Sequence, residues 1–404
     1  MVKKSFSLVI VVLFFSSCTF FKLVKQLDDE EQVFKTGIHK FEFVNNQIQL
    51  VTNIETQSNK RFLLDLGAPV SFIYNNADLE RIIIKENVIR GIGRLKSADG
   101  QTLKRYYYKF KYLENDLFVL RNALMPVVDS PDTISCFRLD GLWGSNVFSS
   151  EFKDAKNKIL LISIQDSTIA VLDQLPDLAE WIEIGTRFNS IGHIYVKINI
   201  GNVEQELILD TGFGGDVIVN SETFQRLLIS GSTDGNITQT YGQVVGSLLG
   251  YGYDTTYYTN AGIRIGRQFE VNPISVRYAK QLKVNALGMG VLQRFNILVD
   301  YQKKAVYLQL NPSFPGNGKS FFFNKGFGLS KQANSRLTVI NIRSKSVADI
   351  AGLRIGDIVL SINGIPVEPD VVCEQLQVYS KLDSKKTDNE VVVQRGNETI
   401  RITL

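Results

Sequence analysis

Two short apolar runs, each closed by an aspartate and a glycine, stand out in the pattern of apolar and polar positions. They cover residues 62–67 and 207–212. An apolar run that ends in glycine predicts a buried strand closing in a tight turn. A carboxylate at the end of such a strand is costly to bury unless hydrogen bonds or a partner compensate it. Asp65 and Asp210 are therefore candidate functional residues.

The pattern around the two aspartates repeats along the chain. Gly144 follows Asp65 by 79 residues, and Gly288 follows Asp210 by 78 residues, each within an apolar segment. Matched landmarks in the same order indicate a duplicated unit, and hence two lobes that bring their aspartates together. The matching flanks are predicted strands or hairpins at 48–54 and 194–200 before the aspartates, and at 152–162 and 295–308 after the glycines.

Composition favours a globular protein rich in β-structure. The chain has 404 residues, of which 44% are hydrophobic and 21% are charged, so it can bury a core. Its 25 Phe and 15 Tyr residues favour strands. The net charge of +4 includes no long basic run, so no nucleic-acid partner is expected.

The scarcity of histidine and cysteine excludes several chemistries. His39 and His193 are the two histidines, and each lies among strand-like residues, which argues against a Ser-His-Asp or Cys-His site. Cys18, Cys136 and Cys373 lie far apart and match no metal-binding spacing. No cofactor and no metal site are expected.

The amino terminus has the pattern of an export signal. Lys3 and Lys4 precede an apolar run over 6–15, which is too short to span a membrane comfortably. Cys18 after two serines resembles a bacterial lipoprotein signal, in which cleavage leaves the cysteine as the first, lipidated residue. The resemblance implies export and a lipid anchor in the bacterial cell envelope. A plain secretory signal with an incidental cysteine, or a short membrane anchor, is the alternative.

The apolar-Asp-Thr-Gly pattern with its downstream glycine resembles a lobe of a retropepsin-type aspartic protease. Two such lobes resemble the tandem, pepsin-like arrangement, over roughly residues 40 to 310. The resemblance implies a catalytic dyad of Asp65 and Asp210. Two carboxylates at about 3 Å cannot both ionise, so one of them keeps a proton. The ionised partner then takes a proton from the attacking water while the protonated one polarises the peptide carbonyl.

The loops after the two aspartates match the family unequally. Four residues are expected to support the dyad: Gly67, Ala68, Thr211 and Gly212. In the family, a threonine hydroxyl at the second position binds across the lobe interface. Leu66 stands at that position in the first loop, and Phe213 replaces the small residue usual after the second glycine. The sequence is therefore also consistent with two other interpretations: a weakened dyad, or a pseudoprotease that only binds peptides.

Two further segments follow from the resemblance. The family has a flap hairpin between each aspartate and its glycine, and the candidates are 91–111, with Asp99 and Gly100 at its turn, and 241–258. Residues 167–189 join the lobes, and their pattern suggests short helical pieces interrupted at Pro176.

The carboxy-terminal part has a separate pattern. Ser346 and Asp349 form a predicted capping box, residues 358, 360 and 362 share one face of a predicted strand, and Pro369 starts a predicted helix. The glycines and apolar residues over 351–364 resemble a bacterial PDZ domain. The carboxylate-binding loop of that family falls on Phe327, Gly328 and Leu329, which implies that a C-terminal peptide adds as a strand there. A domain that only packs on the lobes is the alternative.

The sequence therefore predicts a mainly β, bilobal aspartic-protease-like β-barrel fold followed by a PDZ domain. The expected activity is that of an exported aspartic endopeptidase whose PDZ domain recruits or positions protein substrates. The expected partners are a protein or peptide substrate, a C-terminal peptide and, through the lipid on Cys18, a membrane. The expected segments are a signal peptide (1–17), a tether (18–39), lobe 1 (40–166), a linker (167–190), lobe 2 (191–310), a linker (311–319) and the PDZ domain (320–404).

Overall fold

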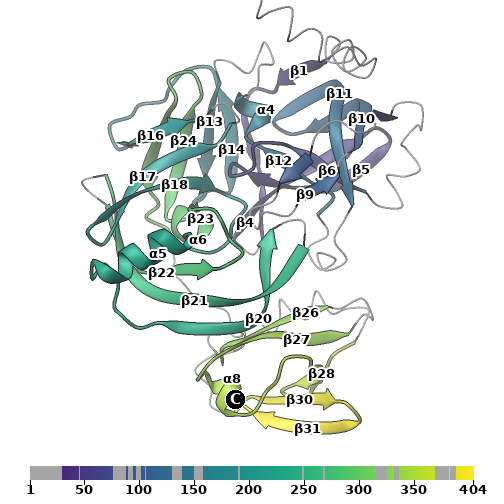
Figure 1. The fold of residues 1–404 in the computed structure, drawn as a ribbon. Coiled ribbons are helices and arrows are strands. Elements are labelled where there is room, and N and C mark those ends of the chain that lie inside the picture. The colour runs from purple at the N-terminus through teal and green to yellow at the C-terminus, as the bar shows by residue number, and fades with distance from the viewer. Residues whose placement is uncertain are drawn as a thin grey trace, which may run out of the picture.

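The structure is a computed structural model of the whole chain. It describes residues 30–44, 46–75, 88–89, 94–96, 102–104, 106–129, 139–149, 158–189, 192–247, 250–266, 269–314, 325–331, 336–368, 382 and 388–404. Within these residues the fold is mainly β, as predicted, with barrel-like sheets and a smaller carboxy-terminal domain (Figure 1).

Lobe 1 is built on one mixed sheet. Nine strands of the described chain take part in it, in the order β1-β11-β6-β12-β5-β4-β10-β7, with β3 beside β4. Their bounds are β1 (Glu31–Phe34), β3 (Glu42–Val44), β4 (Gln47–Ile54), β5 (Gln57–Asp65), β6 (Phe72–Asn75), β7 (Val88–Ile89), β10 (Tyr106–Asn115), β11 (Phe118–Asp129) and β12 (Gly141–Gly144); α4 (Asn146–Ser149) follows. Two short strands, β8 (Arg94–Lys96) and β9 (Thr102–Lys104), pair with each other.

Lobe 2 repeats the central part of this arrangement. Its strands follow the order β16-β17-β18-β23-β19-β22-β21-β20. Their bounds are β16 (Thr186–Phe188), β17 (Ile194–Ile200), β18 (Val203–Asp210), β19 (Val217–Ile218), β20 (Thr238–Ser247), β21 (Gly250–Ile265), β22 (Phe269–Ala279) and β23 (Ala286–Gly288), with α5 (Ser221–Ile229) and α6 (Met289–Leu292).

The strand pairing confirms the internal repeat. In lobe 1, β5 runs parallel to β12 and places Asp65 opposite Gly144. In lobe 2, β18 runs parallel to β23 and places Asp210 opposite Gly288. The glycine strand of each lobe also pairs antiparallel with the strand after the aspartate loop, β6 or β19. The near-equal spacing in the sequence therefore reflects one topology used twice.

A third sheet joins the lobes, because β13 from the first half pairs with β24 from the second. Its order is β15-β25-β24-β13-β14-β2. The bounds are β2 (Ile38–Lys40), β13 (Ile159–Ser163), β14 (Thr168–Leu172), β15 (Ile182–Ile184), β24 (Phe295–Asp300) and β25 (Ala305–Leu310).

Short strands in the three sheets correct two sequence predictions. The helical pieces expected over 167–189 are wrong, because residues 168–172, 182–184 and 186–188 form strands. The tether expected over 18–39 is wrong from residue 31 onward, because β1 pairs with β11 and β2 pairs with β14. Strands of three to five residues carry too little periodicity to be recognised, and here the sheet edges that they complete decide their conformation.

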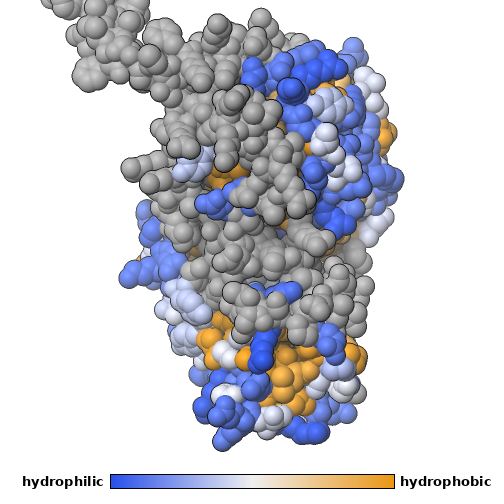
Figure 2. Space-filling model, turned by 90° about the vertical axis from the view of Figure 1, so that its right-hand side faces the viewer, coloured by the Kyte–Doolittle hydropathy of each residue, from blue (hydrophilic) through white to orange (hydrophobic). Residues whose placement is uncertain are grey.

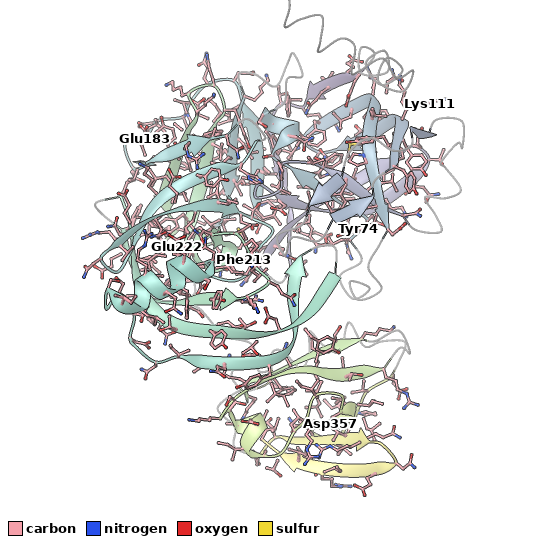
Figure 3. All side chains as sticks on the ribbon, viewed as in Figure 1. Tyr74, Lys111, Glu183, Phe213, Glu222 and Asp357 are labelled. Carbon is pink, nitrogen blue, oxygen red and sulfur yellow. The ribbon has the colours of Figure 1, made fainter. Side chains whose placement is uncertain are left out.

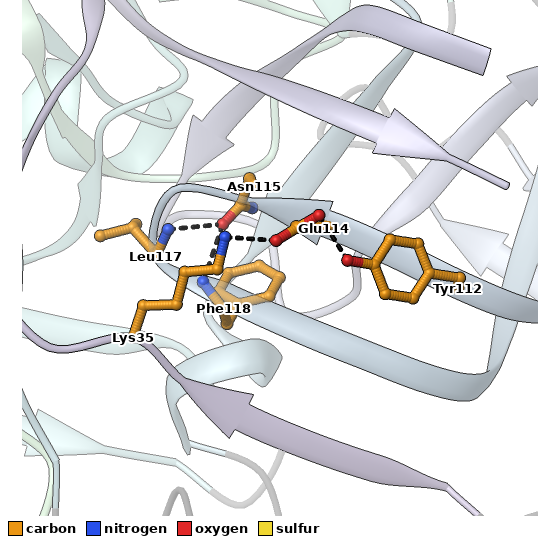
Figure 4. A network of polar contacts seen from close by, with 6 residues as sticks. All are labelled: Lys35, Tyr112, Glu114, Asn115, Leu117 and Phe118. Atoms are coloured by element: carbon orange, nitrogen blue, oxygen red, sulfur yellow. Dashed lines mark hydrogen bonds and ion pairs between the residues drawn. The ribbon is translucent and has the colours of Figure 1, made fainter. Parts of the chain in front are cut away.

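Polar contacts attach the amino-terminal strand to lobe 1. Lys35, just after β1, pairs with Glu114 of β10 at 2.6 Å, and Glu114 also accepts a hydrogen bond from Tyr112 (Figure 4). The Oδ1 atom of Asn115 accepts from the backbone N–H groups of Leu117 (2.8 Å) and Phe118 (3.0 Å), which closes the turn between β10 and β11. Residues 30–35 are therefore part of the lobe.

The carboxy-terminal domain contains β26 (Phe327–Lys331), β27 (Leu337–Arg343), α8 (Val347–Ile350), β28 (Ile358–Ile362), β29 (Ile365–Pro366), β30 (Glu390–Arg395) and β31 (Glu398–Thr403). Ser346 caps α8 by accepting from the backbone N–H of Asp349 (3.2 Å), as predicted. The predicted shared face of residues 358, 360 and 362 is wrong. A bulge between Val359 and Ser361 breaks the period of two, so that Val359 is buried and Leu360 is exposed.

The carboxy-terminal domain is joined to lobe 2 through one strand. In Figure 1 the domain lies beneath β20 and β21, and β20 pairs antiparallel with β27 over residues 240–242 and 341–343. The backbone N–H of Ser344 donates to the carbonyl of Gln239 at 2.8 Å. Gly242 adopts φ +118°, and a Cβ there would lie 2.3 Å from the carbonyl oxygen of Ile340. A side chain at position 242 is therefore incompatible with this junction.

Several predicted features lie outside the described residues: the signal segment with Cys18, the turn at Asp99 and Gly100, most of the linker at 311–319, the helix after Pro369, and Cys136 and Cys373. Of the helices that the structure describes, none has the length and apolar character needed to cross a membrane.

The junction predicts that Gly242→Val separates the carboxy-terminal domain from lobe 2 without unfolding either. Hydrogen exchange should accelerate at the amide of Ser344, which donates to Gln239 across the junction. Gly235→Val is the matched control, because Gly235 also has a positive φ (+71°) but has open space around its Cβ position. Equal protection of the Ser344 amide in both variants would contradict the prediction.

Candidate active site

Asp65 sits at the end of β5, where the chain turns. Its Oδ1 atom accepts hydrogen bonds from the backbone N–H groups of Gly67 (2.8 Å) and Ala68 (3.0 Å). The residue is 8% exposed. The turn thus supplies two of the donors that a buried carboxylate requires.

Asp210 occupies the equivalent place at the end of β18. Its Oδ1 atom accepts from the backbone N–H groups of Gly212 (3.0 Å) and Phe213 (2.9 Å). Phe213, labelled in Figure 3, lies on the side of lobe 2 that faces the middle of the molecule. The two loops therefore hold their aspartates in the same way, although one of them has Phe where the other has Ala.

The two carboxyl groups lie close together across the lobe interface, so that the charge of one acts on the other. Each aspartate also packs against the glycine of the opposite loop. A Cβ on Gly67 would lie 2.6 Å from Cγ of Asp210, and a Cβ on Gly212 would lie 2.4 Å from Cγ of Asp65. Glycine is thus required at both positions, since any side chain would push the carboxyl groups apart.

This environment favours a single shared proton. Burial raises the pKa of Asp65 well above its usual range, and the neighbouring negative charge of Asp210 raises it further. Burial also raises the pKa of Asp210, but hydrogen bonds from Phe213 N–H, Asp65 and Gly212 N–H oppose that rise. The pair therefore keeps a proton at pH values where isolated carboxyls lose it, and the contact favours Asp65 as its holder.

The side chain of Thr211 connects the two aspartate loops across the lobe interface. Its hydroxyl, completely buried, donates to the carbonyl of Leu64 (2.8 Å) and accepts from the N–H of Leu66 (2.9 Å) in the opposite lobe. Leu66 is also completely buried and has no polar atom to return the contact. Thr211 therefore lies where the resemblance expects it. A threonine side chain holds the loop of the opposite lobe in one direction only, from lobe 2 to lobe 1.

Sequence reasoning missed three residues that bridge the lobes. Gln47 Nε2 donates to the carbonyl of Gly212 at 2.7 Å, and Asn46 Nδ2 donates to that of Gly214 at 3.3 Å. Ser145, also in lobe 1, donates through Oγ to the carbonyl of Gly192 at 2.8 Å. Polar residues beside predicted strands are common, so nothing in the sequence singled these residues out.

The candidate flaps are described in part. The second is a hairpin, as predicted, in which β20 and β21 pair from Thr238 and Tyr258 to Ser247 and Gly250. In the first, β8 pairs with β9 and places Leu95 opposite Leu103.

The predicted peptide site of the carboxy-terminal domain lies along β26. Phe327 is buried in the core of this domain, so it can offer only its backbone to a ligand, while Gly328 and Leu329 are half-buried. Among the described strands, β26 pairs with β27 alone. The Nζ atom of Lys325, just before the strand, donates to the carbonyl oxygen of Leu404 at 3.1 Å.

Apolar residues gather on one face of this domain (Figure 2). Its described exposed apolar side chains belong to Val347, Ile350, Ile355, Leu360 and Ile365. By contrast, the salt bridge between Asp357 and Arg395 (2.7 Å) is structural, because Asp357, labelled in Figure 3, is 1% exposed.

In the part of the chain that the structure describes, no group of three or more His, Cys, Asp or Glu residues could hold a metal ion.

The raised pKa of Asp65 makes a prediction about stability. An unfolded aspartate loses its proton near pH 4, whereas folded Asp65 keeps its proton to higher pH. Between the pKa of the unfolded residue and that of the folded residue, the free energy of unfolding therefore falls as pH rises. Asp65→Asn removes this loss. Its free energy of unfolding should rise relative to the parent between pH 4 and 7, by at most about 1.4 kcal/mol per pH unit.

Chemical denaturation at several pH values measures this difference. Asp116→Asn, in the exposed turn between β10 and β11, is the control and should follow the parent. A constant difference between Asp65→Asn and the parent at all pH values would contradict the prediction.

Comparison with known proteins agrees with the carboxy-terminal assignment. Residues 338–382 match the sequence model of the family described as PDZ domain. Comparison with curated proteins gives no match.

Solved structures with similarity to the chain include a retropepsin-like aspartic protease from Rickettsia conorii. It is 25% identical, and the match covers 32% of this chain and 90% of that protein, with a TM-score of 0.25. Basic 7S globulin from soybean (10% identity, 71% of this chain and 96% of that one, TM-score 0.37) and conglutin gamma, a basic 7S globulin from lupine seeds (10%, 68% and 95%, 0.38), also match. The carboxy-terminal module is a PDZ domain.

Proposed function

We propose that the protein is an aspartic endopeptidase in which Asp65 and Asp210 form the catalytic dyad. The observation that carries the proposal is the close approach of two carboxyl groups across the lobe interface, that of Asp65 buried and that of Asp210 half-buried, each held by two backbone N–H groups of its loop. A pair of carboxyls that must share one proton is the arrangement that aspartic proteases use. Burying two acids together is destabilising, so a purely structural role gives no account of the pair.

The shared proton divides the chemical roles. Asp65 holds the proton and donates a hydrogen bond to the carbonyl oxygen of the scissile peptide, which makes its carbon more electrophilic. Asp210 is ionised and accepts a proton from the water that attacks this carbon. The N–H groups of Gly212 and Phe213 keep Asp210 ionised by stabilising its negative charge.

The PDZ domain would position protein substrates for this site. An extended peptide can add to the edge of β26, with its carboxylate at the backbone of residues 327–329. The strand β27 pairs with β26 along one edge and with β20, the first strand of the candidate flap, along the other. Because the flap candidate and the peptide edge share a strand, a bound substrate would be held in a fixed relation to lobe 2.

Export and lipid anchoring through Cys18 are also part of the proposal. They rest on Lys3, Lys4, the apolar run over 6–15 and the two serines before the cysteine. The protease would then act at the bacterial cell envelope, on the periplasmic or cell-surface side.

The dyad is tested by cleavage of an unstructured protein between pH 3 and 7. One carboxyl group cannot both polarise the peptide carbonyl and accept the proton of the attacking water. Asp65→Asn and Asp210→Asn should therefore each lower kcat by about a thousandfold or more, with thermal stability equal to or above that of the parent. Loss in Asp210→Asn alone would exclude Asp65 from the dyad.

The same assay decides between a protease and a peptide-binding pseudoprotease. Leu66→Thr adds the hydroxyl that the first loop lacks. If neither the parent nor Leu66→Thr cleaves at any pH, the protein is a binding protein. If the parent cleaves and Leu66→Thr leaves its rate unchanged, Thr211 and the other interlobe contacts suffice to hold the dyad.

Lipidation is tested separately by expression of the full chain in a bacterium with a labelled fatty acid. The parent should carry the label and fractionate with membranes, whereas Cys18→Ser should lose both properties. Cys136→Ser, which changes a cysteine outside the signal segment, is the matched control and should keep them. Label on Cys18→Ser would contradict the assignment.

A further inference from the structure

The Asp210 loop is held from lobe 1 by a residue that the dyad itself does not include. Gln47, the first residue of β4, reaches across the interface, and its Nε2 atom donates to the carbonyl oxygen of Gly212 at 2.7 Å. This carbonyl and the N–H of Phe213 belong to the same planar peptide unit. That N–H donates to Oδ1 of Asp210 at 2.9 Å. The contacts thus form a chain that runs from Gln47, through one peptide group, to the carboxylate.

The contact from Gln47 compensates for the asymmetry of the loops. Thr211 holds the Asp65 loop from lobe 2 through Leu64 and Leu66. The side chain of Leu66 cannot hold the Asp210 loop in return, because it has no donor or acceptor. Gln47 supplies a donor from the same lobe to the same loop, two residues beyond Asp210.

Asn46 adds a second contact of the same kind. It precedes β4 with φ 59°, a conformation that asparagine tolerates better than most residues. Its Nδ2 atom donates to the carbonyl oxygen of Gly214 at 3.3 Å. Two consecutive amide side chains of lobe 1 therefore hold the carbonyl groups on either side of Phe213.

We propose that Gln47 is the positioning residue of the Asp210 loop, and that it fixes the Gly212–Phe213 peptide from across the lobe interface in place of the hydroxyl that position 66 lacks. This inference rests on the proposed function for its catalytic consequence, but the geometry of the loop can be tested without turnover. Gln47 acts through the peptide group and not on the substrate.

The consequence is electrostatic. A hydrogen bond to a carbonyl polarises its peptide group and strengthens the bond that the attached N–H donates. Among the described residues, the groups that act on the carboxylate of Asp210 are the carboxyl group of Asp65 and the N–H groups of Gly212 and Phe213. Loss of the Gln47 contact would weaken the Phe213 bond and thereby raise the lower apparent pKa of the Asp65–Asp210 pair.

The test compares Gln47→Met with Gln49→Met in the full chain. Methionine keeps the length of glutamine but has no donor. Gln49 lies two residues along the same strand and pairs with Leu63 of β5. The lower apparent pKa of the pair is read by carbon-13 NMR on protein labelled at the aspartate carboxyl carbons, with Asp210→Asn to assign the signal.

We expect Gln47→Met to raise this pKa by about half a unit to one unit, the size of one modest hydrogen bond. The acid limb of the kcat profile should move to higher pH by the same amount, with KM unchanged. Gln49→Met should leave both in place.

Each outcome bears on the proposal. An unchanged pKa in Gln47→Met, or an equal shift in Gln49→Met, would overturn it. If Gln47→Met does not fold, Gln47→Ala replaces it, since it removes the donor without adding a charge that would itself raise the pKa; an unchanged pKa there also overturns the proposal. A shifted pKa in a protein that never cleaves would support the positioning role and contradict only the peptidase assignment.

Discussion

The close approach of Asp65 and Asp210 constrains the two loops that carry them and the lobes behind those loops. Two buried acids repel each other unless they share a proton, and they need donors to replace water. The turns after β5 and β18 supply these donors. Gly67 and Gly212 allow the loops to approach closely, since a Cβ at either position would overlap the opposite carboxyl group.

Such an approach requires the lobes to be held rigidly, and the strand pairing explains how. The sheet that contains β13 and β24 crosses from one half of the chain to the other, so the lobes share backbone hydrogen bonds as well as side-chain contacts. The bonds of Thr211 and Gln47 then fix the two loops locally. The sheet sets the distance between the lobes, whereas these side chains set the orientation of the peptide groups that face the carboxylates.

The pairing of β20 with β27 holds the PDZ domain against lobe 2, again through backbone hydrogen bonds. A domain connected only by a flexible linker would sample many positions relative to the lobes. Here backbone pairing and the close approach at Gly242 fix its position against lobe 2. The proposed peptide-binding strand β26 and the β20–β21 hairpin are therefore separated by one strand, β27.

The β-rich class, the duplicated unit, the two aspartates and the PDZ module can all be predicted from the sequence. These features depend on local signals: apolar runs that end in glycine, equal spacings, and the glycines and apolar residues over 351–364. Features that depend on distant partners could be known only from the folded chain. The short strands β2 and β14 form because a sheet edge is available to them, and the bulge in β28 reverses the exposure of Leu360. The role of Gln47 was also invisible in the sequence, because a glutamine becomes a positioning residue only when folding brings a carbonyl group from 165 residues away to its amide.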